Sequence, residues 1–155
     1  MSRRRAPKKR IVSPDPHYSN ITVQILVNNL MKDGKKSLAY KIVYQSIEEI
    51  KGRSDQDPLQ LIEKAVANVT PSAIVKARRI GGSTYQMPIA ITPDRGKSLG
   101  IRWILNASRT RAGKSMISKL SNELLDAFNN QGNAIRKKQE TLRMAEANKA
   151  FARGK

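Results

Sequence analysis

The sequence contains no cysteine and no long hydrophobic run. Without cysteine there is no disulfide framework, no thiolate zinc site and no cysteine nucleophile. The longest uninterrupted apolar run is three residues, whereas a membrane span needs about 20 and a signal-peptide core about 7–15. We therefore expect a soluble protein with no membrane partner and no secretory signal.

Acidic residues are also scarce relative to basic ones. The 155 residues include 30 Lys and Arg against 12 Asp and Glu, a net charge of +18. Because like charges repel in a compact chain, such an excess indicates a polyanionic partner. The charge lies in blocks, with a net +8 over residues 1–46, −2 over 47–71, +9 over 72–122 and +3 over 123–155.

The first ten residues are too basic to bury apolar surface. Pro14 and Pro16 favour an extended segment after them. We predict a basic extension over residues 1–16 that an anionic partner orders, followed by a single helical domain over 17–155. The alternative is a tail that only increases solubility. The basic residues of the extension are Arg3, Arg4, Arg5, Lys8, Lys9 and Arg10.

Apolar residues recur at helical spacing in six stretches. Ile21 and Leu38 belong to the apolar faces of the first two, and Asp57 followed by Pro58 is a strong start signal for the third. The last stretch is the weakest and runs to about Phe151. The six stretches are 21–31, 38–51, 58–69, 99–108, 116–128 and 134–151.

Between the third and fourth stretches the apolar period changes to two. Two alternating runs flank Gly81-Gly82-Ser83-Thr84, which predicts a β-hairpin at about residues 73–91. We expect Lys76 and Arg78 on one face of it, with Tyr85 and Met87 on the other. The predicted fold is mainly α: a six-helix bundle-like body with one protruding β-hairpin between the third and fourth helices.

Glycine, lysine and serine occur together at three predicted helix starts: 34–37, 96–98 and 113–115. A fourth basic group, 136–138, opens the last helix. Backbone N–H groups at a helix start are unpaired and partly positive, so lysine is unfavourable there unless an anion binds. These positions indicate phosphate contacts, or else solvated lysines beside ordinary caps. A Walker loop is excluded because the upstream glycine is replaced by Ile91 or Ser108.

Arg95, Arg102 and Arg109 recur every seven residues in the fourth predicted helix. This spacing keeps them on one face, and no acidic residue lies three or four positions away. The planar guanidinium suits bidentate phosphate contact, so the row is interpreted as a backbone-binding ridge and not a merely solvated face. Trp103, with apolar neighbours, is interpreted as a core residue.

Signals for catalysis and cofactors are poor. His17 is the only histidine, so no second histidine or cysteine could complete a metal site with it, and no cofactor is expected. An RNA-modifying enzyme would need a cofactor loop or an acid–base pair that is not found. The acidic residues around the second and third helices predict a face turned away from the polyanion or toward a basic neighbour protein; they are Glu48, Glu49, Asp55, Asp57 and Glu63.

Four segments together carry a specific resemblance: 33–37 (DGKKS), 76–86 (KARRIGGSTYQ), Arg102-Trp103 and 143–152 (RMAEANKAFA). Along its whole length the chain resembles the family of bacterial-type small ribosomal subunit proteins seven. The resemblance implies a structural, non-enzymatic protein that binds the 3′ major domain of small-subunit rRNA and nucleates head assembly. It also implies a hairpin near the messenger exit and the exit-site tRNA, and neighbouring ribosomal proteins, including protein eleven, as partners.

Charge and resemblance select the same rRNA-binding surface, with specificity expected from RNA shape more than from sequence. The chain ends with 153–155 (RGK) where the family has aromatic or histidine residues, and 35–40 (KKSLAY) is more similar to plastid members than to bacterial ones. We therefore favour a plastid ribosome over a bacterial one. Besides the six basic residues of the extension, the predicted rRNA-binding residues are Lys35, Lys36, Lys76, Arg78, Arg79, Arg95, Lys97, Arg102, Arg109, Arg111 and Lys114.

An architectural DNA-bending protein is the alternative from another class. Such proteins often insert an apolar wedge or an arginine into the minor groove. The predicted hairpin tip, Gly82-Ser83-Thr84, offers neither. Competition between a junction RNA and duplex DNA would separate the two hypotheses.

Overall fold

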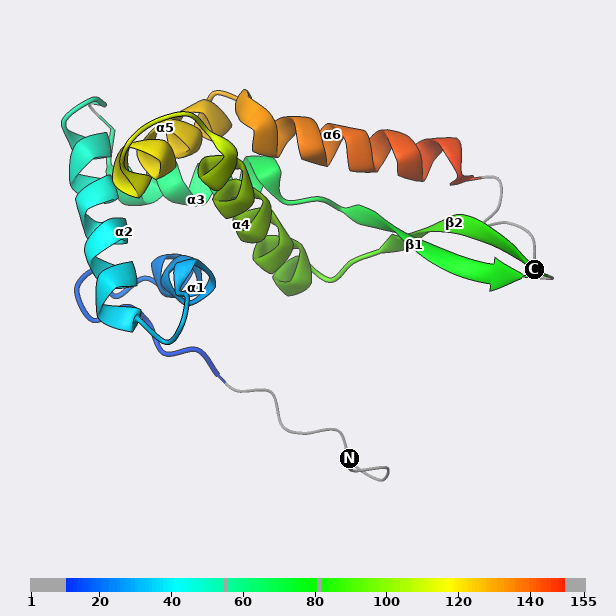
Figure 1. Ribbon diagram of the computed structural model, residues 1–155, viewed down its shortest axis with the longest axis horizontal. Helices are drawn as coiled ribbons and strands as arrows, with labels where there is room; N and C mark the ends of the chain where they lie inside the picture. Colours follow the sequence, from blue (N-terminus) through cyan, green and yellow to red (C-terminus); the bar gives the residue numbers. More distant parts are fainter. Residues whose placement is uncertain (1–10, 55, 81, 150–155) are drawn as a thin grey trace.

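A computed structural model describes residues 11–54, 56–80 and 82–149, which form six α-helices and one two-stranded antiparallel sheet (Figure 1). The prediction of a mainly α fold with a hairpin between the third and fourth helices is confirmed. The elements are α1 (Ile21–Leu30), α2 (Lys36–Lys51), α3 (Pro58–Val69), β1 (Ala73–Ile80), β2 (Ser83–Ala90), α4 (Pro93–Thr110), α5 (Met116–Phe128) and α6 (Gly132–Ala147).

The helical body is organised around α5, which packs against α2, α3, α4 and α6. Val27, Ile50, Ile104 and Leu120 are all 0% exposed, so side chains from four helices meet in one core. The helix starts are fixed locally. Asn20 caps α1 by accepting from the backbone N–H of Thr22 at 2.7 Å, and Asp57 and Ser115 cap α3 and α5 in the same way.

The apolar faces of the first two helices differ from the prediction at their edges. Ile21 is 54% exposed and Leu38 is 50% exposed, because α1 buries Val23 and Val27 and α2 buries Ala39 in their place. The expected end of the last helix near Phe151 lies outside the described residues, and α6 is described to Ala147.

The helix α4 begins six residues earlier than the apolar spacing predicts. Pro93 takes its first position, and Gly96 is a buried residue inside the helix. A Cβ on Gly96 would lie 3.0 Å from the Thr70 methyl group, and one on Gly100 would lie 3.3 Å from the Thr70 backbone. These glycines therefore allow α4 to approach the end of α3 closely, and the expectation that Gly96 precedes a helix is wrong.

The hairpin pairs in a register that corrects the predicted faces. Lys76 is opposite Met87 and Arg78 is opposite Tyr85. Directly opposed residues in an antiparallel pair point to the same side of the sheet. The expectation that Lys76 and Arg78 lie on the face away from these two residues is therefore wrong. The helix α6 extends beside the hairpin and contacts both strands (Figure 1).

Candidate nucleic-acid interface

The turn between α1 and α2 presents two lysines at a helix start. Asp33 and Gly34 have φ values of +53° and +71°, which reverse the chain within one tight turn. The N–H of Lys35 donates to the carbonyl of Lys32 at 3.0 Å. Lys35 and Lys36 are exposed, and the Lys36 ammonium lies 5.6 Å from the centroid of the Tyr40 ring. The start of α2 has no side-chain cap, and the N–H of Lys36 donates to the Gly34 carbonyl at 2.8 Å, so the next N–H groups of the first turn remain available to an anion.

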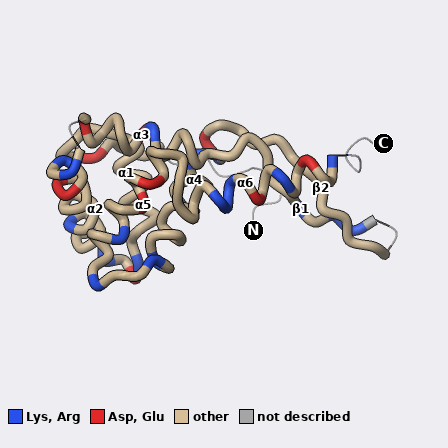
Figure 2. Tube along the Cα trace, turned by 90° about the horizontal axis from the view of Figure 1, so that it is seen from above, with Lys and Arg blue, Asp and Glu red and all other residues tan. Residues whose placement is uncertain are grey.

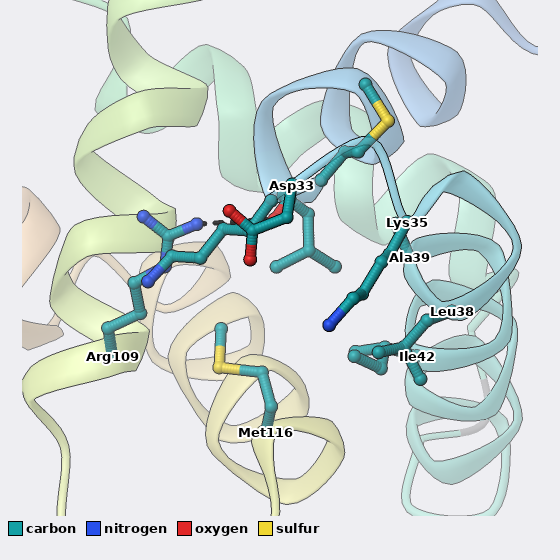
Figure 3. Close-up of a pocket in the computed structure, with 10 residues that line it drawn as sticks. Asp33, Lys35, Leu38, Ala39, Ile42, Arg109 and Met116 are labelled. Carbon is teal, nitrogen blue, oxygen red and sulfur yellow. Dashed lines mark hydrogen bonds between the residues drawn. The ribbon is translucent and has the colours of Figure 1, made fainter.

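The end of α4 and the start of α5 lie against this turn. Arg109 is half-buried, and its guanidinium donates to the Leu30 carbonyl at 3.3 Å, at the end of α1. A cavity of about 320 Å³ separates Arg109 from Lys35, and Figure 3 shows both side chains directed toward it. Lys114, two residues before the cavity-lining Met116, is exposed. Two of the four predicted helix-start sites therefore come together here.

The other two sites do not keep the geometry on which their prediction rests. Lys97 is exposed but lies within α4, after a first turn that contains Asp94. At the start of α6, the buried Glu123 carboxylate accepts from the N–H of Ala134 at 3.0 Å. The position where a phosphate was expected is thus occupied by a carboxylate of the chain itself. Lys137 pairs with Glu140, and Lys138 donates to a backbone carbonyl.

Arg111 has internal partners as well. Its guanidinium lies 2.9 Å from the Glu123 carboxylate and also pairs with Asp126. Burial lowers the pKa of Arg111, but hydrogen bonding to Asp126 and attraction by Glu123 outweigh burial, so the net shift is upward. The charge of Arg111 is neutralised within the fold, which leaves less of it for an external phosphate. Its predicted rRNA contact stays a prediction.

The exposed cations of α4 and the hairpin have no such partners. Arg95 and Arg102 are exposed and form no ion pair with another described residue. On β1, Lys76, Arg78 and Arg79 are exposed, and Arg78 and Arg79 point to opposite faces because strand side chains alternate. The hairpin therefore carries positive charge on both faces.

Positive charge gathers on one side of the helical body. In Figure 2, several Lys and Arg segments lie along one edge of the body and most Asp and Glu segments of the body lie away from it, whereas the part of the chain with α6 and the hairpin carries both Lys or Arg and Asp or Glu segments. Exposed Glu48 on α2 and Glu63 on α3 belong to the acidic residues expected to face away from a polyanion. Six predicted site residues and one of the acidic residues lie outside the described residues: Arg3, Arg4, Arg5, Lys8, Lys9, Arg10 and Asp55.

Two features of this surface were not found from the sequence. One is the cavity, because spacing along the chain does not bring Met116 and Ile42 together. The other is an aromatic cluster in which the His17 ring lies 4.7 Å from Tyr18 and 5.3 Å from Tyr44. The buried Asp15 carboxylate accepts from the Tyr44 hydroxyl at 2.9 Å and from the N–H of Tyr18, so the chain is anchored to α2 from Asp15 onward.

Among the described residues there is no group of three or more acidic or histidine side chains that could hold a metal ion. In the same part of the chain, none of the helices has the length and apolar character that crossing a bilayer requires.

Comparison with known proteins gives a consistent result over the whole chain. The family described as Ribosomal protein S7p/S5e matches residues 2–149. Small ribosomal subunit protein uS7c of Pleurastrum terricola is 58% identical over 153 residues, 99% of either chain. The uS7c of Prototheca wickerhamii is 57% identical over 99% of this chain and 98% of its own. Small ribosomal subunit protein uS7 of the cyanobacterium Thermosynechococcus vestitus is 54% identical over 98% of this chain and 97% of its own.

Proposed function

The chain belongs to the ribosomal protein S7p/S5e family, and from this premise we propose that it binds the 3′ major domain of small-subunit rRNA by neutralising phosphates. As a member of the family it is a structural, non-enzymatic component of the small ribosomal subunit, where rRNA and other ribosomal proteins are its partners. Its similarity to uS7c proteins supports a plastid ribosome as its location, with a cyanobacterial relative also close.

The observation that carries the proposal is a set of exposed cations on adjoining elements that form no ion pair with another described residue. Lys35 and Lys36 open α2, Arg102 and Arg95 stand on α4, and Lys114 precedes α5. Arg111, by contrast, has a carboxylate nearby, and its charge is neutralised by an ion pair within the fold. The unpaired set is available to phosphates that would otherwise repel one another where RNA helices meet. Packing of those helices is how the protein nucleates assembly of the subunit head.

The hairpin extends this surface beyond the body. Each strand has eight residues, which at about 3.3 Å per residue gives a reach of roughly 25 Å. We place its tip near the messenger exit and the exit-site tRNA. We propose that the acidic residues of α2 and α3 contact basic neighbouring proteins. Small-subunit ribosomal protein eleven is a further proposed neighbour.

Charge reversal tests the proposal. Arg102→Glu should weaken binding to a transcript of the 3′ major domain by at least tenfold, because it replaces a phosphate contact with repulsion. Lys51→Glu is the matched control, since Lys51 is an exposed lysine at the far end of α2 from Lys36. Affinities would be measured at physiological salt, with duplex DNA as competitor. Equal losses for both variants, or equal affinity of the protein for RNA and duplex DNA, would refute the proposal.

A further inference from the structure

The cavity beside Lys35 combines an apolar interior with a charged rim. It encloses about 320 Å³ between the α1–α2 turn, the first turns of α2, the end of α4 and the start of α5. Leu38, Ile42 and Met116 extend into it in Figure 3, and Met31 also lines it. Pockets for small ligands begin at roughly 300 Å³, so this space suits one compact group and not an extended molecule.

The rim is mainly positive. Lys32 and Lys35 lie on the turn, and Arg109 lies across the cavity from them, held by the Leu30 carbonyl. Leu38 is 50% exposed at the opening, although a leucine in this position gains by being covered. The occupant should therefore bring an apolar surface and a negative charge within a short distance of each other.

A nucleotide has both properties, because its base offers two apolar faces and its phosphate is anionic. We propose that the cavity receives one unpaired nucleotide of the bound rRNA, with its base on the apolar interior and its phosphate at Lys35 and Arg109. This inference rests on the proposed function. The methionines are suited to the base, since thioether sulfur makes favourable contacts with aromatic rings. Recognition of unpaired, extruded bases is a general mode of RNA binding.

One carboxylate adds a preference among bases. Asp33 lines the cavity, and it has no hydrogen bond or ion pair with another described residue. A carboxylate only accepts hydrogen bonds, and an exocyclic amino group of a base can donate one. Adenine, guanine and cytosine can each donate from an amino group, whereas the single N3–H donor of uracil lies between two carbonyl oxygens that a carboxylate repels, so uracil is disfavoured.

The first test compares two half-exposed aliphatic residues. Leu38→Asn changes the cavity opening, whereas Ile21→Asn changes a residue of similar exposure on α1 that does not line it. Binding of a plastid 3′ major domain transcript should weaken about fivefold for Leu38→Asn and stay unchanged for Ile21→Asn. Equal affinities of the wild type and both variants would overturn the proposal. Loss of binding by the wild type itself would overturn the proposed function instead.

The second test reads the base directly. Ala39→Leu fills the cavity, and Ala67→Leu is its control at an exposed position of α3. With wild-type protein, one unpaired adenine, guanine or cytosine of the transcript should be protected from probes that modify Watson–Crick edges. This protection should be lost with Ala39→Leu and kept with Ala67→Leu, at concentrations that saturate the RNA. If no base depends on the cavity in this way, or if the base is uracil, the nucleotide site or its preference is refuted.

Discussion

Replacing Arg111 with methionine should destabilise the fold. Methionine keeps the apolar stem of the side chain and removes its charge. The Glu123 side chain, which is 0% exposed, would then keep a charge with no cation beside it. Removing one partner of a fully buried pair costs about 3–5 kcal/mol.

The magnitude must be reduced for solvent, because the Arg111 side chain is 26% exposed. We expect the free energy of unfolding to fall by about 2–4 kcal/mol. With a urea dependence of about 2 kcal/mol per molar, the unfolding midpoint, followed by circular dichroism, should fall by about 1–2 M.

A second substitution makes the reasoning refutable. In Arg111→Met/Glu123→Gln the buried charge is gone, while the amide oxygen can still accept from the N–H of Ala134. The double variant should therefore be more stable than Arg111→Met alone. The comparison variant Arg102→Met should change stability by less than about 0.5 kcal/mol and reduce RNA affinity. Wild-type stability of Arg111→Met, or further loss in the double variant, would refute the internal role of Arg111.

Three more outcomes follow from particular residues. Gly132→Ala should lower the free energy of unfolding more than Gly34→Ala does, as measured by urea titration. Both glycines have positive φ, but only a Cβ at residue 132 would lie 2.9 Å from the Glu123 carboxylate. Equal losses for the two variants would contradict this. Burial and the hydrogen bond to Asp15 raise the pKa of Tyr44 from 10 to about 12. Between pH 10 and 12 the Tyr44 hydroxyl therefore keeps its proton in the folded protein and loses it when the protein unfolds. Stability should therefore fall as pH rises from 10 to 12, and Tyr44→Phe should flatten this dependence. Deleting residues 2–10 should make the salt dependence of RNA binding less steep. Each phosphate contact contributes about −0.7 to −0.9 to the slope of the logarithm of the binding constant against the logarithm of the salt concentration. An unchanged slope would mean that the extension contacts no phosphate.

Local patterns predicted the helices and the hairpin well, but they could not predict how residues pair across the turn. Alternation within β1 and within β2 is as expected. Two residues separate the strands and Ile80 pairs with Ser83, so even-numbered positions of β1 share a face with odd-numbered positions of β2. The predicted faces assumed equal parity on both strands. Turn length, not side-chain pattern, decides this point.

The candidate site was predicted in part for a similar reason. Lys35 and Lys114 are exposed beside the starts of α2 and α5, as expected, and their phosphate contacts stay predictions. The argument failed at α6 because Glu123, eleven residues before Ala134, supplies the anion from the core. Whether a carboxylate is buried against a helix start depends on tertiary packing, which spacing along one helix does not reveal. The cavity between α2, α4 and α5 was missed for the same reason.

The close contact of α3 with α4 also affects the direction in which the hairpin leaves the helical body. Thr70 leads into β1, and Gly96 and Gly100 follow β2, so both arms leave the body at the point where these residues touch. A methyl group added at Gly100 would push α4 and Thr70 apart by a few tenths of an ångström. Because the hairpin is roughly 25 Å long, the resulting tilt would displace its tip by more than its base. Gly96 and Gly100, although uncharged, therefore help to set the direction of the hairpin, together with the contacts of α6 with both strands.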